Sequence, residues 1–155
     1  RFINSNWITK VTTPSKPSEL LARYSDGLLK KNTKLAPNEI EEKLSEMVVI
    51  FNFLSDKDSF ISFYTQSFSK RLISQTSASD NLEELMITKL KSCYGLDCMI
   101  ALTRMYNDVQ LTRELNDEFA RYMNDKPIRS TLSFNAMIVT QGTWHLGKSS
   151  TEIIF

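Results

Sequence analysis

Few residues of this chain could do chemistry, and their spacing predicts no catalytic site. The chain holds one histidine, His145, and two cysteines, Cys93 and Cys98. A structural zinc site usually takes four Cys or His ligands, so these three residues are too few and we expect no metal. A Ser/His/acid triad would need a carboxylate from another segment to orient His145, and no pattern marks one. The simpler interpretation of His145 is a loop or packing residue.

A phosphate-binding loop is also not expected. The tripeptide Gly147-Lys148-Ser149 matches the end of such a loop, and Gly142 stands five residues before Gly147. No helix is expected after it, however, and so short a motif is weak alone, so we interpret the match as chance. The chain has no GxGxxG motif. We therefore expect no cofactor and no enzymatic activity from these residues alone.

Four cations are better candidates for a binding role. Lys70 and Arg71 end an apolar helical run, and Lys89 and Lys91 flank Leu90 on the next expected helix. If these two helices are antiparallel neighbours, the cations form a basic streak that suits an acidic partner segment. The alternative is ordinary solvated helix surface, since cations are favoured near helix C-termini. The residues alone leave both interpretations open.

Composition limits the classes of partner. With 155 residues and 41% hydrophobic content, the chain suits one domain of ordinary size. Its 19 basic and 18 acidic residues argue against nucleic acid bound through overall charge, and no aromatic residues alternate with the cations. No apolar run approaches the roughly 20 residues that cross a bilayer, and no signal peptide is recognisable. We expect no nucleic-acid or membrane partner and two reduced cysteines.

Apolar residues recur every three or four positions and predict five helices. Prolines mark two helix starts and one helix end, Ser55 and Asp58 form an expected capping box, and Gly95 is an expected left-handed stop. The expected helices start at Pro17, Pro37, Ser55, Ser79 or Asp80, and Asp97, and the last continues to Asn124 before Pro127.

The strongest stripe lies on the third expected helix. Phe60, Tyr64, Phe68 and Leu72 are each four residues apart, which places them on one face. Leu90 belongs to the inner face of the following helix. These five residues are the predicted core of an antiparallel bundle that resembles a four-helix bundle.

A short strand is expected after the helices. Residues 134–140 read FNAMIVT, which is apolar and partly β-branched, and Gly142 would end the run. A lone strand cannot satisfy its own backbone groups, so this one must pair with later sequence or with another protein.

Longer strings resemble one family. PSELLARYSDGLLKK, FNFLSDKDSFISFYTQSFSKRLI, SASDNLEELMITKLKSCYG and the tail FNAMIVTQGTW are similar, in order and spacing, to the cullin homology region of the cullins. RFINSN and ELLARY look most like the cullin-1 type. The stretch GTWHLGKSS departs from the GSWP that many cullins carry, so this corner could be built differently.

The resemblance implies a mainly α fold followed by a short β-strand that begins an α/β subdomain. Residues 1–16 would be a linker from a preceding cullin repeat, residues 17–126 the helical bundle, and residues 127–155 the start of the α/β part. Cullins are non-catalytic scaffolds of ubiquitin ligases in the cytoplasm and nucleus. The lysine that accepts the ubiquitin-like modifier would lie beyond Phe155.

The implied partners are a small RING protein, a ubiquitin-conjugating enzyme and the remainder of the cullin chain. A sheet shared with the RING protein would include Phe134, Ala136, Ile138 and Val139. A basic groove for the acidic tail of the conjugating enzyme would include Lys70, Arg71, Lys89 and Lys91. Two alternatives remain: a helical adaptor unrelated to ubiquitin, and the cullin-like subunit of the anaphase-promoting complex.

Overall fold

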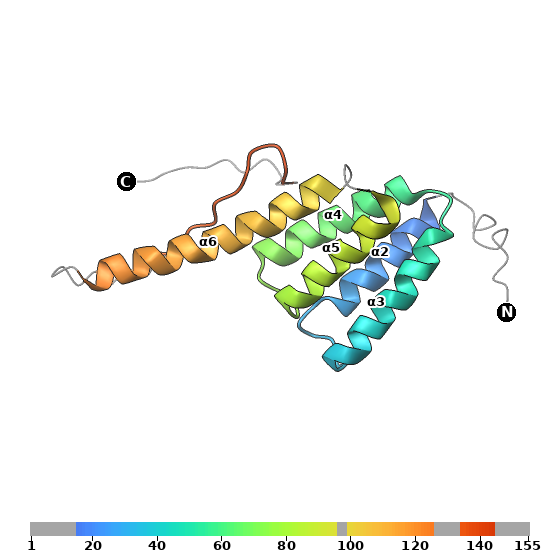
Figure 1. The fold of residues 1–155 in the computed structure, drawn as a ribbon, viewed down its shortest axis with the longest axis horizontal. Helices are drawn as coiled ribbons and strands as arrows, with labels where there is room; N and C mark the ends of the chain where they lie inside the picture. Colours follow the sequence, from blue (N-terminus) through green and yellow to red (C-terminus); the bar gives the residue numbers. More distant parts are fainter. Residues whose placement is uncertain (1–14, 96–98, 126–133, 145–155) are drawn as a thin grey trace.

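Five helices and one extended segment make up the described chain (Figure 1). The computed structural model describes residues 15–95, 99–125 and 134–144. Within these ranges every named element is a helix, so the mainly α prediction is confirmed. The helices are α2 (Lys16–Leu28), α3 (Pro37–Asn52), α4 (Lys57–Ile73), α5 (Asp80–Tyr94) and α6 (Ile100–Asn124).

Local signals set the helix ends, with one correction. Pro37 opens α3 as predicted, and Gly95 ends α5 with φ of 103°, a left-handed conformation that glycine adopts without a Cβ penalty. The capping box predicted at Ser55 and Asp58 is wrong. Asp56 caps α4 instead, because its carboxylate accepts hydrogen bonds from the Ser59 N–H at 3.0 Å and the Ser59 hydroxyl at 2.6 Å. The cap predicted at Asp97 lies outside the described residues.

The bundle core contains all five residues predicted for it. Aromatic rings of α4 stack along the helix, with centroids of Phe60 and Tyr64 5.9 Å apart and those of Tyr64 and Phe68 6.0 Å apart. Leu72 and Leu90 are also buried. Phe51 of α3 packs against Phe60 with a centroid separation of 4.9 Å. The apolar spacing in the sequence therefore identified the buried face of α4 correctly.

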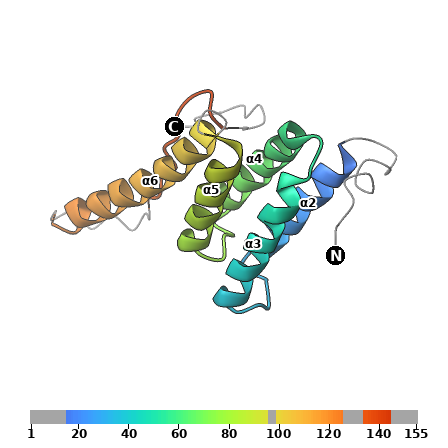
Figure 2. The ribbon, with the colours of Figure 1, turned by 45° about the vertical axis from the view of Figure 1, so that its right-hand side comes forward.

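The helices pack in a definite order around this core. α2 contacts α3 and α4, α3 contacts α5, and α6 contacts both α4 and α5. The C-terminal half of α6 extends past the other helices in both views (Figures 1 and 2). Exposed apolar side chains there include Leu115 and Phe119. No helix in the described ranges is long and apolar enough to cross a membrane.

Residues 134–144 run back along α6 without forming a strand (Figure 1). The predicted strand at residues 134–140 is therefore not formed in this structure. The physical reason is the lack of a pairing strand among the described residues, so side chains of α6 bind the backbone instead. Gly142, with φ of 80°, lies in the turn that follows. The linker predicted at residues 1–16 lies almost wholly outside the described ranges, as do residues 126–133 and 145–155.

Candidate interaction surfaces

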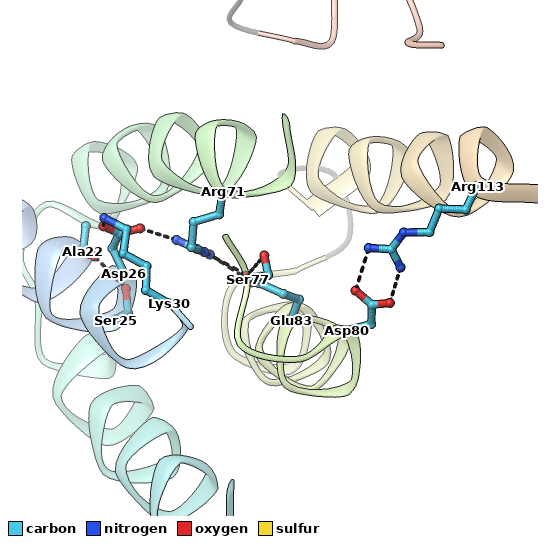
Figure 3. A network of polar contacts seen from close by, with 9 residues as sticks. All are labelled: Ala22, Ser25, Asp26, Lys30, Arg71, Ser77, Asp80, Glu83 and Arg113. Atoms are coloured by element: carbon cyan, nitrogen blue, oxygen red, sulfur yellow. Dashed lines mark hydrogen bonds and ion pairs between the residues drawn. The ribbon is translucent and has the colours of Figure 1, made fainter. Parts of the chain in front are cut away.

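Arg71 lies inside the bundle, which corrects its assignment to a basic groove. Its side chain is 1% exposed. Nε and Nη2 donate to the two carboxylate oxygens of Glu83 at 2.8 and 2.9 Å, and Nη1 donates to Asp26 at 2.6 Å (Figure 3). The Glu83 side chain is itself 0% exposed. A guanidinium enclosed in this way cannot meet a partner on the surface.

Several neighbours keep this guanidinium charged. Burial lowers the pKa of Arg71, but hydrogen bonds from its side chain to Glu83 and Asp26 and the charge of Glu83 outweigh burial and raise the pKa above its ordinary value. The guanidinium carbon also lies 5.6 and 5.7 Å from the ring centroids of Tyr64 and Phe68. Such cation–π contacts strengthen when water is excluded. Arg71 therefore stays ionised within the core.

The polar contacts around Arg71 join three helices and two of the connections between helices. We name this group the Arg71 cluster: Asp26, Lys30, Arg71, Ser77 and Glu83. Lys30 pairs with Asp26 at 2.5 Å, and the Ser77 hydroxyl donates to Glu83 at 2.8 Å. These side chains come from α2, α4 and α5 and from the α2–α3 and α4–α5 connections (Figure 3).

Backbone hydrogen bonds reinforce the same junction. The Lys31 N–H donates to the Thr76 carbonyl at 2.9 Å, and the Ala78 N–H donates to the Leu29 carbonyl at 2.7 Å. They form an antiparallel bridge between Lys30 and Ser77. The cluster and the bridge together fix the end of α2 against the start of α5.

The other three cations of the predicted groove are distributed along the bundle. Lys70 and Lys91 are exposed and Lys89 is half-buried. Lys70 neighbours Arg71, whose head meets the first turn of α5, whereas Lys91 lies about 12 Å further along α5 than Glu83. Charges so far apart are largely screened from each other at physiological salt, where the Debye length is about 8 Å. The structure thus separates Lys70 from Lys91 and from Lys89, which stands two residues before Lys91 on α5.

Three polar residues of α6 bind the backbone of the extended segment. We name them the α6 ladder: Asp108, Thr112 and Asn116. The Asn116 side-chain amide accepts from the Ala136 N–H at 3.0 Å and donates to the Ala136 carbonyl at 2.8 Å. The Thr112 hydroxyl accepts from the Ile138 N–H at 3.1 Å and donates to the Ile138 carbonyl at 2.9 Å. Each of these two side chains makes the pair of backbone hydrogen bonds that a neighbouring strand would otherwise make.

Asp108 completes the ladder at the far end. Its carboxylate accepts from the Thr140 N–H and hydroxyl, both at 2.8 Å, and from the Trp144 indole Nε1 at 2.7 Å. Burial raises the pKa of Asp108, but these three hydrogen bonds and the nearby charge of Arg104 lower it, and the net pKa lies below the ordinary value. The ladder therefore depends on an ionised carboxylate.

We expect acid to release this end of the segment. A depressed pKa in the folded state contributes stability above the unfolded value of about 3.9, and this contribution is lost as pH falls through the folded pKa. In a Trp7→Phe background, Trp144 is the one remaining tryptophan, and its fluorescence should shift as pH falls below about 4. Asp108→Asn should remove this transition, whereas the control Asp80→Asn should keep it. An unchanged transition in Asp108→Asn would contradict the assignment.

The predicted sheet residues fall within or next to this ladder. Ala136 and Ile138 bind α6 directly, and Val139 packs against the bundle core. Phe134 packs against Phe119 of α6 with ring centroids 5.0 Å apart. The structure thus brings these four residues together along α6. Cys93 is a free thiol, and Cys98 and His145 lie outside the described residues.

Comparison with known proteins identifies the family. The family model described as the cullin alpha solenoid domain matches residues 1–116. The chain is 42% identical to Cullin-1 of Caenorhabditis elegans over 148 residues, which cover 92% of this chain and 19% of that protein.

Two further relatives agree. Cullin-1 of Dictyostelium discoideum is 41% identical over 98% of this chain and 20% of its own length. Cullin-2 of C. elegans is 43% identical over 84% of this chain and 17% of its own length. The chain thus spans about a fifth of the length of these relatives. By these matches the chain belongs to the cullin family.

Proposed function

We propose that this chain is a scaffold segment of a cullin-RING ubiquitin ligase and acts by fixing distances between bound partners. Membership in the cullin family is the observation that carries the proposal. The packing of the bundle supports it, because the contact between Phe51 of α3 and Phe60 of α4 and the Arg71 cluster tie the helices to one another. A stiff spacer raises the effective concentration of an acceptor lysine near the charged conjugating enzyme.

The extended segment is the part proposed to meet the RING protein. Its backbone is already straight, and Phe134 and Ile138 are 65% and 48% exposed. An extended peptide that adds to such a segment gains main-chain hydrogen bonds, and side-chain pockets supply specificity. In this proposal residues 127–155 begin an α/β subdomain, and the segment becomes a strand when Phe134, Ala136, Ile138 and Val139 join a shared sheet.

Three lysines of the predicted groove are proposed to guide the conjugating enzyme. Lys70, Lys89 and Lys91 remain from the predicted groove, and Arg71 does not, because it is buried in its own cluster. Separate positive charges attract an acidic tail over some distance and so change the association rate more than the affinity. The complex would act in the cytoplasm and nucleus.

We expect the double substitution Lys70→Glu and Lys91→Glu to slow ubiquitin-chain synthesis about tenfold at low salt, because reversed charges repel an acidic tail during encounter. The measurement is the chain-synthesis rate of the full-length protein with its RING partner across a salt series. The difference from wild type should shrink as salt rises. The double substitution Lys34→Glu and Lys43→Glu, before and on α3, is the charge-matched control. Equal rates for the double variant and wild type at low salt would remove the docking role.

One experiment separates this function from that of a helical adaptor unrelated to ubiquitin. The full-length protein should co-purify with a small RING protein and support ubiquitin transfer by a charged conjugating enzyme. Co-purification of amphipathic peptides without a RING protein would favour the adaptor.

A further inference from the structure

The α6 ladder matches the repeat of an extended chain. Asp108, Thr112 and Asn116 are four residues apart on a helix, which gives an axial spacing of about 6.0 Å. They bind Thr140, Ile138 and Ala136, which are two residues apart on an extended chain and so about 6.6–6.8 Å apart. The two repeats differ by less than about 1 Å per step. The helix can therefore bind every second residue of the segment, running in the opposite direction.

The geometry also limits the ladder to a short length. Four residues turn a helix by about 400°, so each step rotates the binding side chain by about 40° around the axis. About three steps can face one straight segment before the stripe turns away. The sequence agrees, because the next position along α6 is Ala120, which has no polar side-chain group.

The ladder satisfies one edge of the segment and leaves the other open. In an extended chain, the N–H and C=O of one residue point to the same side, and those of the next residue point to the opposite side. Residues 136, 138 and 140 direct their backbone groups toward α6. Within the described ranges, the N–H and C=O groups of Asn135, Met137 and Val139 have no hydrogen-bond partner. Their edge is thus free to pair with a strand.

We propose that Asp108, Thr112 and Asn116 are positioning residues that act as a substitute strand, holding residues 136–140 extended so that a partner strand adds only at the edge of residues 135, 137 and 139. The proposed occupant is an extended segment of the RING partner, and this choice rests on the proposed function. The positioning role has two consequences. It fixes the register of the added strand. It also orders residues 136–140 before the partner binds, so less conformational entropy is lost on binding.

Amide exchange in the 155-residue chain tests the positioning role directly. Residue-resolved NMR should show an alternating pattern, with the amides of 136, 138 and 140 exchanging at least about tenfold more slowly than those of 137 and 139. Thr112→Val keeps the side-chain shape and removes the hydroxyl, so the Ile138 amide should lose its protection while α6 keeps its own. Thr112→Ser should restore the protection. Thr103→Val on the same helix is the matched control and should change nothing.

Binding by the full-length protein tests the consequence. Thr112→Val and Asn116→Leu should each weaken the affinity for the small RING protein about tenfold, and Thr112→Ser should restore it. The matched control Asn107→Leu on exposed α6 surface should bind as wild type does. Equal exchange across residues 136–140, or unchanged RING affinity in both ladder variants, would overturn the positioning role. Failure of the wild-type protein to bind any RING protein, with the alternating pattern intact, would instead contradict the proposed function.

Discussion

Replacing Glu83 by alanine should lower the free energy of unfolding by about 3–5 kcal/mol, the usual cost of removing one partner of a buried ion pair. Glu83 accepts two hydrogen bonds from Arg71 and one from Ser77, and both Arg71 and Glu83 are almost fully buried. Without Glu83, the guanidinium would stay in the core with Asp26 as its remaining carboxylate. Urea denaturation followed by circular dichroism measures the loss.

Two further variants show whether the cost comes from the unpaired charge. Glu84→Ala, one position along the same helix and exposed, should change stability by less than about 0.5 kcal/mol. Arg71→Met with Glu83→Leu removes both charges and fills the space with apolar atoms, so it should cost less than Glu83→Ala alone. A Glu83→Ala protein as stable as Glu84→Ala would show that the Arg71 cluster does not stabilise the bundle.

Replacing Phe68 by alanine should cost a similar amount, about 3–5 kcal/mol, for a different reason. Phe68 is fully buried, its ring stacks on Tyr64, and its face lies beside the Arg71 guanidinium. The substitution removes apolar contacts and leaves a cavity that the surrounding helices can fill only in part. Phe60→Ala, two stripe positions earlier and outside the cation–π contacts of Arg71, should show the same cavity cost. Thermal and urea unfolding both measure it.

The matched control is Phe53→Ala, because Phe53 is 50% exposed at the end of α3. It should lose less than about 1 kcal/mol, since a half-exposed ring creates no closed cavity. Losses under about 1 kcal/mol for both Phe60→Ala and Phe68→Ala would contradict the packing of α4.

Apolar periodicity predicted the helices and the core well because burial selects residue types directly. The stripe of α4 needed only the four-residue spacing of Phe60, Tyr64 and Phe68. Helix ends were predicted less well. Two capping pairs are possible one residue apart, Ser55 with Asp58 and Asp56 with Ser59. The sequence alone does not decide which pair forms.

The burial of Arg71 could have been predicted from the same spacing. Arg71 stands three residues after Phe68 and seven after Tyr64, which places it on the buried face. The position of Arg71 next to Leu72 indicates by itself only the border of that face. Glu83 has the same kind of spacing, since it stands four residues before Ile87 and seven before Leu90, on the buried face of α5. Opposite charges on two apolar faces predict a buried pair, but only the fold brings α4 and α5 together.

The extended segment could not be predicted in the same way. Residues 134–140 have the composition of a strand, and the prediction assumed that another strand must satisfy their backbone. The structure satisfies one edge with side chains of α6 instead. The polar stripe of Asp108, Thr112 and Asn116 was visible in the sequence, but polar residues on a helix usually face water. Their role depends on tertiary contacts.

A distance measurement tests most directly whether this part of a cullin is a stiff spacer. Spin labels would replace Glu42 on α3 and Glu118 on α6, two exposed positions, in the full-length protein. Pulsed electron paramagnetic resonance should give one narrow distance distribution that stays in place when the RING protein and the conjugating enzyme bind. A broad distribution, several separate distances, or a shift on binding would contradict the scaffold account.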